Sequence, residues 1–130
     1  HYIIEAHPQV CDKAKEMWFD VHCGKWEDVV EDFIKEGKRF DSIYFDTYSF
    51  NSKTDPQWSS FTKLVPKLIN PNGIYSYFNN LSAKIEKVEE IIESFGWEKH
   101  KKTIPKSNIY KSYELIWYIN KWFLKILIFI

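Results

Sequence analysis

Hydrophobic positions along the chain follow two periodicities. Short apolar runs of the strand type are separated by longer segments in which apolar residues recur three or four positions apart, the spacing of an amphipathic helix. The pattern predicts strands at 1–5, 19–23, 41–46, 74–78, 97–103 and 109–118, and helices after Pro8 and over 26–36, 58–69 and 83–95. Strands that alternate with helices indicate an α/β fold with a mostly parallel sheet, and the last two strands indicate an antiparallel C-terminal edge. No repeat or domain boundary interrupts 1–130, which predicts a single domain.

Local signals refine several of these elements. Pro8 can occupy the first turn of a helix, and Gly37 can end one. Pro66 is expected to kink or shorten the third helix, and residues 70–73 (NPNG) are expected to form a turn. The residues expected to face inward from the first two helices are Val10, Ala14, Met17 and Trp18, and then Val29, Val30, Phe33 and Ile34.

Composition excludes some functions. Eighteen Lys and Arg balance 18 Asp and Glu, so no basic field attracts nucleic acid. Four scattered His do not suggest a metal centre, and none is expected. Cys11 and Cys23 form neither a zinc pattern nor a disulfide framework, and are expected to be buried or half-buried thiols. No secretory signal is visible, which favours a cytoplasmic location. The sequence sets no oligomeric state.

The segment 117–130 (WYINKWFLKILIFI) is almost wholly apolar. It is shorter than the roughly 20 apolar residues that a membrane-spanning helix needs. Three interpretations remain open: a buried final strand, an interfacial or partner-binding segment, or a tail that is not native to the fold.

Acidic residues follow two of the predicted strands. Glu5 ends the first strand, and Asp46, with Tyr48 two residues later, ends the third. In open α/β sheets, ligands bind at the carboxyl ends of the strands, so an acid there can hold ribose hydroxyls or a guanidinium group. The alternatives are a solvated strand-end acid for Glu5 and a cap or solvated acid for Asp46.

Two loops could complete such a site. Gly24 and Lys25 lie between a strand and a helix, where backbone groups can flank an adenine; alternatively, Gly24 only makes the turn. The amides of Asn79 and Asn80 and the Ser82 hydroxyl could bind a substrate carboxylate, or they could cap the following helix.

Taken together, these segments resemble guanidinoacetate N-methyltransferase and the related fungal-type arginine N-methyltransferases, over roughly residues 1 to 105. The motifs that carry the resemblance are HYIIE, GKWEDV, FDSIYFDTYSF, the NPNG turn and NLS at 80–82. The resemblance implies a class I methyltransferase fold, which is Rossmann-like, with S-adenosyl-L-methionine as cofactor. It implies methyl transfer to a guanidino nitrogen of a small molecule, with guanidinoacetate, the precursor of creatine, as first choice. Protein arginine methylation and a non-catalytic, incomplete fragment are the alternatives.

The resemblance also implies roles for individual residues. In the cofactor site, Glu5 resembles the ribose-binding acid, Ala6 and His7 lie beside the adenosine, and Gly24 and Lys25 flank the adenine. Asp46, which also borders the cofactor, resembles the carboxylate that binds and activates the guanidino group, with Tyr48 beside it. The loop with Asn80, Leu81 and Ser82 resembles the site for the substrate's carboxylate.

The chain departs from this family in several places. Lys25 replaces an apolar residue and Ser49 a proline, and the segment after Ile109 does not match. The family's first strand and glycine-rich loop are not among these 130 residues. In the family's strand order, 3-2-1-4-5-7-6, that strand lies between those that carry Glu5 and Asp46. The expected sheet is therefore a partial one, with a gap between two interior edges.

Overall fold

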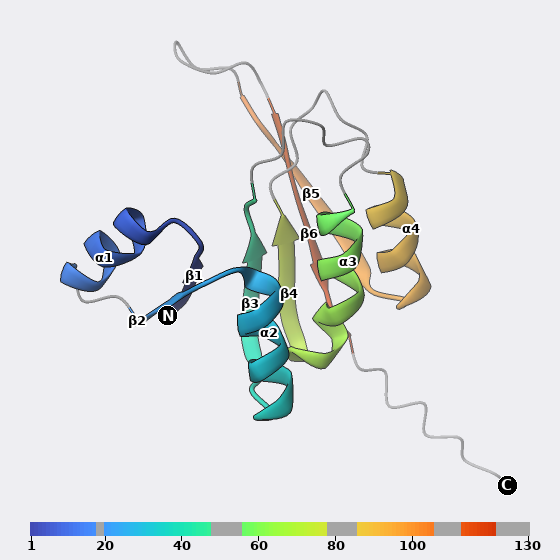
Figure 1. Cartoon of the computed structure of the whole chain (residues 1–130). Helices are drawn as coiled ribbons and strands as arrows, with labels where there is room; N and C mark the ends of the chain where they lie inside the picture. Colours follow the sequence, from blue (N-terminus) through green and yellow to red (C-terminus); the bar gives the residue numbers. More distant parts are fainter. Residues whose placement is uncertain (18–19, 48–55, 78–85, 106–112, 122–130) are drawn as a thin grey trace, which may run out of the picture. The chain divides into compact units, whose positions relative to one another are not determined.

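A computed structural model describes residues 1–17, 20–47, 56–77, 86–105 and 113–121, and these belong to two compact units (Figure 1). The first unit spans His1–Lys38 and the second Arg39–Ile130. In chain order the elements are β1 (Tyr2–Glu5), α1 (Pro8–Glu16), β2 (Asp20–Cys23), α2 (Trp26–Lys35), β3 (Phe40–Phe45), α3 (Gln57–Leu64), the 3-10 turn η1 (Val65–Lys67), β4 (Ile69–Tyr77), α4 (Glu86–Ser94), β5 (Glu98–Ile104) and β6 (Tyr113–Ile119). The single partial domain expected over 1–130 stays a prediction.

The first unit is a β-α-β segment followed by a second helix. β1 and β2 pair in parallel, and Glu5 lies opposite Cys23 at their carboxyl ends. Pro8 begins α1, where its missing N–H removes no intrahelical bond. α2 buries Val30 and Phe33, as its spacing predicts, and the chain leaves it through Gly37 at a φ of +68°.

The second unit has a four-stranded mixed sheet in the order β3-β4-β6-β5. β3 and β4 run parallel, whereas β6 is antiparallel to both β4 and β5. Within each sheet, the neighbouring strands are those that the predicted order gives: β1 beside β2, and β3, β4, β6 and β5 in succession. The gap expected between the two groups of strands stays a prediction.

One face of the second sheet carries the core of that unit. Because side chains alternate across a strand, Tyr75 and Tyr77 of β4 share a face, and both are buried together with Tyr118 of β6. α3 covers this face through Phe61, whose ring stacks on Phe45 with centroids 4.0 Å apart.

A buried hydrogen bond joins α3 to the middle of β4. The Thr62 hydroxyl lies 3.0 Å from the Tyr75 hydroxyl and donates to the Trp58 carbonyl at 2.7 Å. Burial raises the pKa of Tyr75 well above its usual range, so this phenol stays protonated. The contact therefore satisfies polar groups that the core would otherwise leave without a partner.

Thr62→Val is expected to destabilise the protein by about 1–3 kcal/mol, since it leaves the buried Tyr75 hydroxyl without this partner. Thr62→Ser is the matched control: it keeps the hydroxyl and removes one methyl group, at a cost near 0.8 kcal/mol. Urea unfolding of both variants measures the difference. Equal midpoints would mean that the hydroxyl contact adds no stability.

Two predicted elements differ from the structure. Residues 70–73 form no separate turn but belong to β4, where the pairing with β3 shifts between Phe40 and Ser42. Asn72 has a φ of +62°, and its N–H donates to the Asn120 carbonyl at 2.7 Å. Residues 70–73 therefore form an irregularity within a longer strand. The helix predicted at 58–69 ends at Leu64, and Pro66 lies in η1, as its shortening effect predicts.

The expected inward face of α1 was wrong at two of its positions. Val10 is 50% exposed and Met17 is 59% exposed, whereas Ala14 is half-buried and Cys11, which was not expected to face inward, is fully buried. Trp18 lies outside the described residues. α1 is a polar helix, and a periodicity carried by so few apolar residues does not determine which side faces the sheet.

The remaining elements follow the predictions within a few residues at their ends. β2 begins at Asp20, α4 is described from Glu86, and β6 from Tyr113. The apolar segment 117–130 contributes its first three residues to β6, and residues 122–130 lie outside the described part. No helix among the described residues is long and apolar enough to cross a membrane.

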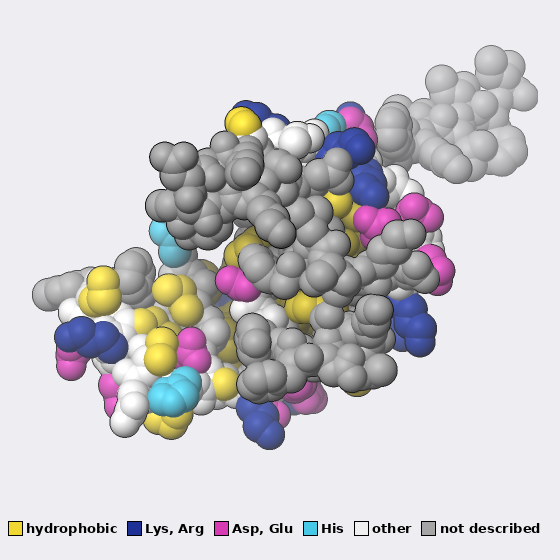
Figure 2. Space-filling model, turned by 90° about the horizontal axis from the view of Figure 1, so that it is seen from above, with side chains coloured by type: hydrophobic (Ala, Val, Ile, Leu, Met, Phe, Trp, Pro, Cys, Tyr) yellow, Lys and Arg dark blue, Asp and Glu magenta, His cyan; other side chains and the backbone are white. Residues whose placement is uncertain are grey.

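Acidic and basic side chains both lie on the surface of the described residues. On the face drawn in Figure 2, acidic and basic side chains of the described residues lie interspersed, which matches the balanced composition. Several form exposed ion pairs, among them Lys13 with Glu16, Lys35 with Glu31, and Lys99 with Glu89.

Candidate functional site

The carboxyl ends of β1 and β2 bring five of the predicted cofactor residues together. Glu5, Ala6 and His7 follow one another at the end of β1, and Gly24 and Lys25 follow β2. The Gly24 N–H donates to the Glu5 carbonyl at 3.0 Å, so the first residue after β2 bonds to the last residue of β1. The two segments therefore form one edge, which is where an open α/β sheet binds its ligand.

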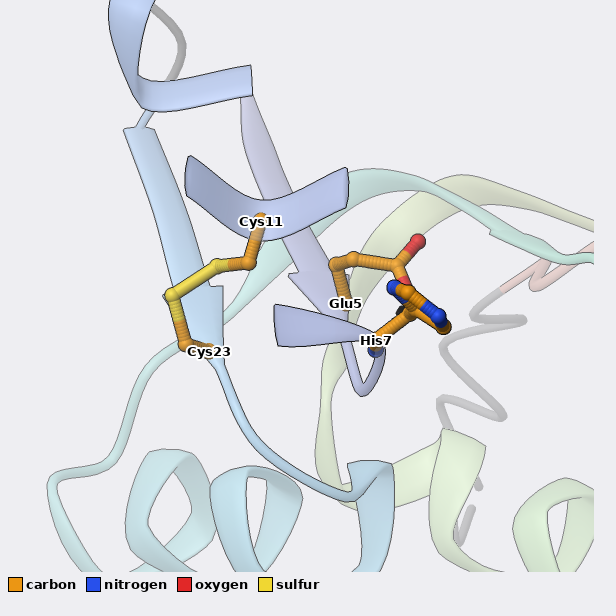
Figure 3. The surroundings of a disulfide bond; sticks show 4 residues. All are labelled: Glu5, His7, Cys11 and Cys23. Atoms are coloured by element: carbon orange, nitrogen blue, oxygen red, sulfur yellow. Dashed lines mark hydrogen bonds between the residues drawn. A yellow bond between two sulfur atoms is a disulfide. The ribbon is translucent and has the colours of Figure 1, made fainter. Parts of the chain in front are cut away.

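The Glu5 carboxylate is held in place by the backbone. Its Oε1 accepts a hydrogen bond from the His7 N–H at 2.7 Å, and the side chain is half-buried. Figure 3 shows the carboxylate and the His7 ring pointing to the same side. A carboxylate has about four acceptor sites, so a fixed Glu5 keeps capacity for further donors such as a ribose diol.

Gly24 is required by its backbone conformation. Its φ of +154° lies in the region that residues with a Cβ rarely adopt. A Cβ at this position would lie 3.6 Å from Val29 Cγ2, so the first turn of α2 borders Gly24. Lys25, which follows, is exposed and precedes the first residue of α2, Trp26, whose side chain is half-buried. Glu27 and Asp28 then occupy the first turn of α2, where acidic side chains interact favourably with the positive end of the helix dipole.

Asp46 lies in the second unit, directly after β3. Its side chain is exposed, whereas the preceding Phe45 is 5% exposed and packs on α3. Because Phe45 pairs with Tyr77, the chain leaves β3 and β4 at the same edge of the sheet. Asp46 is therefore an exposed acid at the carboxyl end of β3, directly after a residue that packs in the core.

Other predicted residues fall outside this geometry. Tyr48, Asn80, Leu81 and Ser82 lie outside the described residues, so their roles stay predictions. Among the described residues, no group of three or more His, Cys, Asp and Glu is arranged to hold a metal ion.

The prediction that Cys11 and Cys23 are separate thiols was wrong. A disulfide joins Cys11 of α1 to Cys23, the last residue of β2, with their Cα atoms 5.8 Å apart (Figure 3). In a parallel β-α-β unit, the helix begins at the edge where the second strand ends, and it packs back on the strands. The signal was therefore present in the sequence: one cysteine lies early in the helix and the other at the strand's carboxyl end.

The chain is similar in sequence to known proteins. Protein arginine N-methyltransferase 2 of Yarrowia lipolytica is 38% identical over 89 residues, which cover 64% of this chain and 18% of that protein. The protein of the same name from Candida glabrata is 38% identical over 90 residues, covering 64% and 21%. The chain thus spans about a fifth of the length of these relatives. No protein-family model matches the chain.

Two solved structures share the arrangement of elements. Precorrin-6y C5,15-methyltransferase from Geobacter metallireducens superposes with a TM-score of 0.60 at 13% identity, covering 92% of this chain and 67% of that one. The complex of M1.HpyAVI with SAM gives 0.52 at 15% identity, covering 93% and 56%. The chain has a class I methyltransferase fold. This fold confirms the predicted α/β class. The strand order within each sheet agrees with the same fold.

Proposed function

We propose that this chain is the part of an S-adenosylmethionine-dependent N-methyltransferase that binds the nucleoside end of the cofactor and presents Asp46 to a guanidino nitrogen. The observation that carries the proposal is the Glu5 carboxylate, held by the His7 N–H at the carboxyl end of β1, where the Glu5 carbonyl also accepts the Gly24 N–H. The residues at this edge fit the cofactor, because a half-buried acid and a backbone without a side chain suit a ribose and an adenine.

The proposed acceptor is arginine rather than guanidinoacetate. Two relatives at 38% identity are named protein arginine N-methyltransferase 2. This supports the arginine alternative over the first choice from the sequence. Both acceptors share the guanidino group that Asp46 would bind, so the same carboxylate serves in either case.

The chemistry assigns a task to each residue. When bound, S-adenosylmethionine supplies a methyl group on a sulfonium sulfur, which keeps the bonding electron pair as the nitrogen forms its new bond to carbon. Glu5 holds the ribose, Ala6 and His7 lie along the adenosine, and Gly24 and Lys25 flank the adenine. Asp46 orients the guanidino group with two charge-assisted hydrogen bonds and takes the proton that the nitrogen loses. The family resemblance assigns Tyr48 to the site of the guanidino group, and Asn80, Leu81 and Ser82 to the binding of the acceptor's carboxylate or backbone.

Calorimetric titration with S-adenosylhomocysteine tests the cofactor part of the proposal. Glu5→Gln is expected to weaken binding about 10- to 100-fold, because hydrogen bonds to a charged group contribute roughly 1.5–3 kcal/mol. Glu31→Gln is the matched control, since Glu31 forms an exposed ion pair with Lys35 on α2 in the same unit. Equal affinity for Glu5→Gln and the unchanged chain would remove Glu5 from the site, and no binding by the unchanged chain would contradict the proposed function.

A further inference from the structure

The disulfide closes a ring of contacts around Glu5. Cys23 pairs with Glu5 across the two strands, and the Glu5 carboxylate accepts the His7 N–H at 2.7 Å. The His7 carbonyl in turn accepts the Cys11 N–H at 2.9 Å, as the first turn of α1. The bond from Cys11 to Cys23 completes the ring. The position of the Glu5 carboxylate is therefore tied to the first turn of α1, and that turn is tied to β2.

The buried face of α1 is small. Of its nine residues, Cys11 is fully buried and Ala14 is half-buried, whereas Val10 keeps half of its surface exposed. Apolar burial is what fixes a surface helix to its sheet. With so little of it in α1, the covalent bond is expected to contribute much of the hold between α1 and β2.

We propose that the Cys11–Cys23 disulfide is a reversible redox switch that orders the first turn of α1 and, through His7, the Glu5 carboxylate. The link to cofactor binding rests on the proposed function of Glu5. In the reduced state, α1 separates from the end of β2, and the His7 N–H no longer holds the carboxylate. The oxidised state is the one competent to bind a nucleoside.

The reductant is a dithiol. One of its thiolates attacks the Cys23 sulfur, because Cys23 is exposed and Cys11 is fully buried. The bond between the two protein sulfurs breaks, and Cys11 leaves as a thiolate that takes up a proton. The second thiol of the reductant then attacks the first, which releases Cys23, so that two protein thiols and one oxidised dithiol result. The reverse exchange, with an oxidised dithiol as the oxidant, forms the Cys11–Cys23 bond again and returns the dithiol. In a reducing compartment, a disulfide that forms is transient and suits sensing rather than permanent support.

Hydrogen exchange of the full chain tests the switch. The amides of α1 are compared in the oxidised chain, in the chain reduced with dithiothreitol, and after reoxidation. Reduction is expected to speed exchange in α1 at least tenfold and reoxidation to reverse it, while α4 in the second unit stays unchanged. The double variant Cys11→Ala/Cys23→Ser should exchange like the reduced chain with or without dithiothreitol. The proposal would be overturned if exchange in α1 did not change on reduction. It would also be overturned if dithiothreitol, added without denaturant, left the Cys11–Cys23 bond intact.

Titration with S-adenosylhomocysteine separates this proposal from the proposed function. If a tenth of the reduced molecules keep Glu5 ordered, affinity falls about tenfold on reduction. Equal, measurable affinity in both states would overturn the link to Glu5 and leave the cofactor site intact. No binding in either state, together with faster exchange on reduction, would contradict the proposed function and support the switch in α1.

Discussion

An Asp46→Asn chain is expected to lose methyl transfer to a guanidino acceptor by a factor of about 10² to 10⁴, the range that a positioned general base contributes. The Asp46 carboxylate is exposed immediately after β3, where it can meet a ligand. In the proposed role, this carboxylate accepts two parallel hydrogen bonds from a guanidinium and takes up one proton. Asparagine has nearly the same size, but its NH₂ group would face the N–H donors of the acceptor, and the neutral amide does not accept the proton.

The measurement is transfer of a radiolabelled methyl group from S-adenosylmethionine to an arginine-containing peptide and, in parallel, to guanidinoacetate. Asp41→Asn is the matched control. Asp41 lies on the same strand and accepts a bond from Asn70 Nδ2 at 2.9 Å, which an amide oxygen can also accept. Its activity should stay within about twofold, as for most surface substitutions. Full activity of Asp46→Asn would exclude the proposed role, and preference for guanidinoacetate over the peptide would reverse the choice of acceptor.

Much of the fold could be predicted because the strands and most helices have strong local signals. The alternation of elements predicted the α/β class, and the family resemblance predicted the order that the two sheets show. The misplaced turn at 70–73 has a physical reason. Its residues have turn propensity, but the backbone bonds of Asn72 and Gly73 to Asn120, about 50 positions later, keep them within β4. The local turn propensity of a segment does not indicate hydrogen bonds to residues so far along the chain.

The candidate site was predictable where it depends on strand ends. Glu5 and Gly24 meet as expected, because parallel strands place their carboxyl ends at one edge. The hydrogen bond from His7 to Glu5 was not expected, since it depends on where the chain turns into α1. The disulfide was missed because the cysteines were judged by count and motif rather than by their positions in the predicted β-α-β unit.

Removing the disulfide is expected to destabilise the first unit by about 3 kcal/mol, the loop-closure value for a bond between residues 12 positions apart. The described part of this unit has a small core, with Cys11, Val30 and Phe33 as its buried apolar residues. A small core contributes little stability, so a cross-link accounts for a large share of what holds the unit together. The test compares the oxidised chain with Cys11→Ala/Cys23→Ser.

Urea unfolding, followed by circular dichroism and by hydrogen exchange of the β1 amides, measures the loss. The oxidised chain treated with dithiothreitol should unfold at the same urea concentration as the double variant, since both lack the same bond. Val10→Ala is the matched control on α1, because it shortens an exposed side chain and keeps the cross-link; its effect should stay within about 0.5 kcal/mol. A double variant as stable as the oxidised chain would show that packing alone holds α1 on β2. In that case reduction could not release the helix, and the bond would have no means of controlling the Glu5 carboxylate.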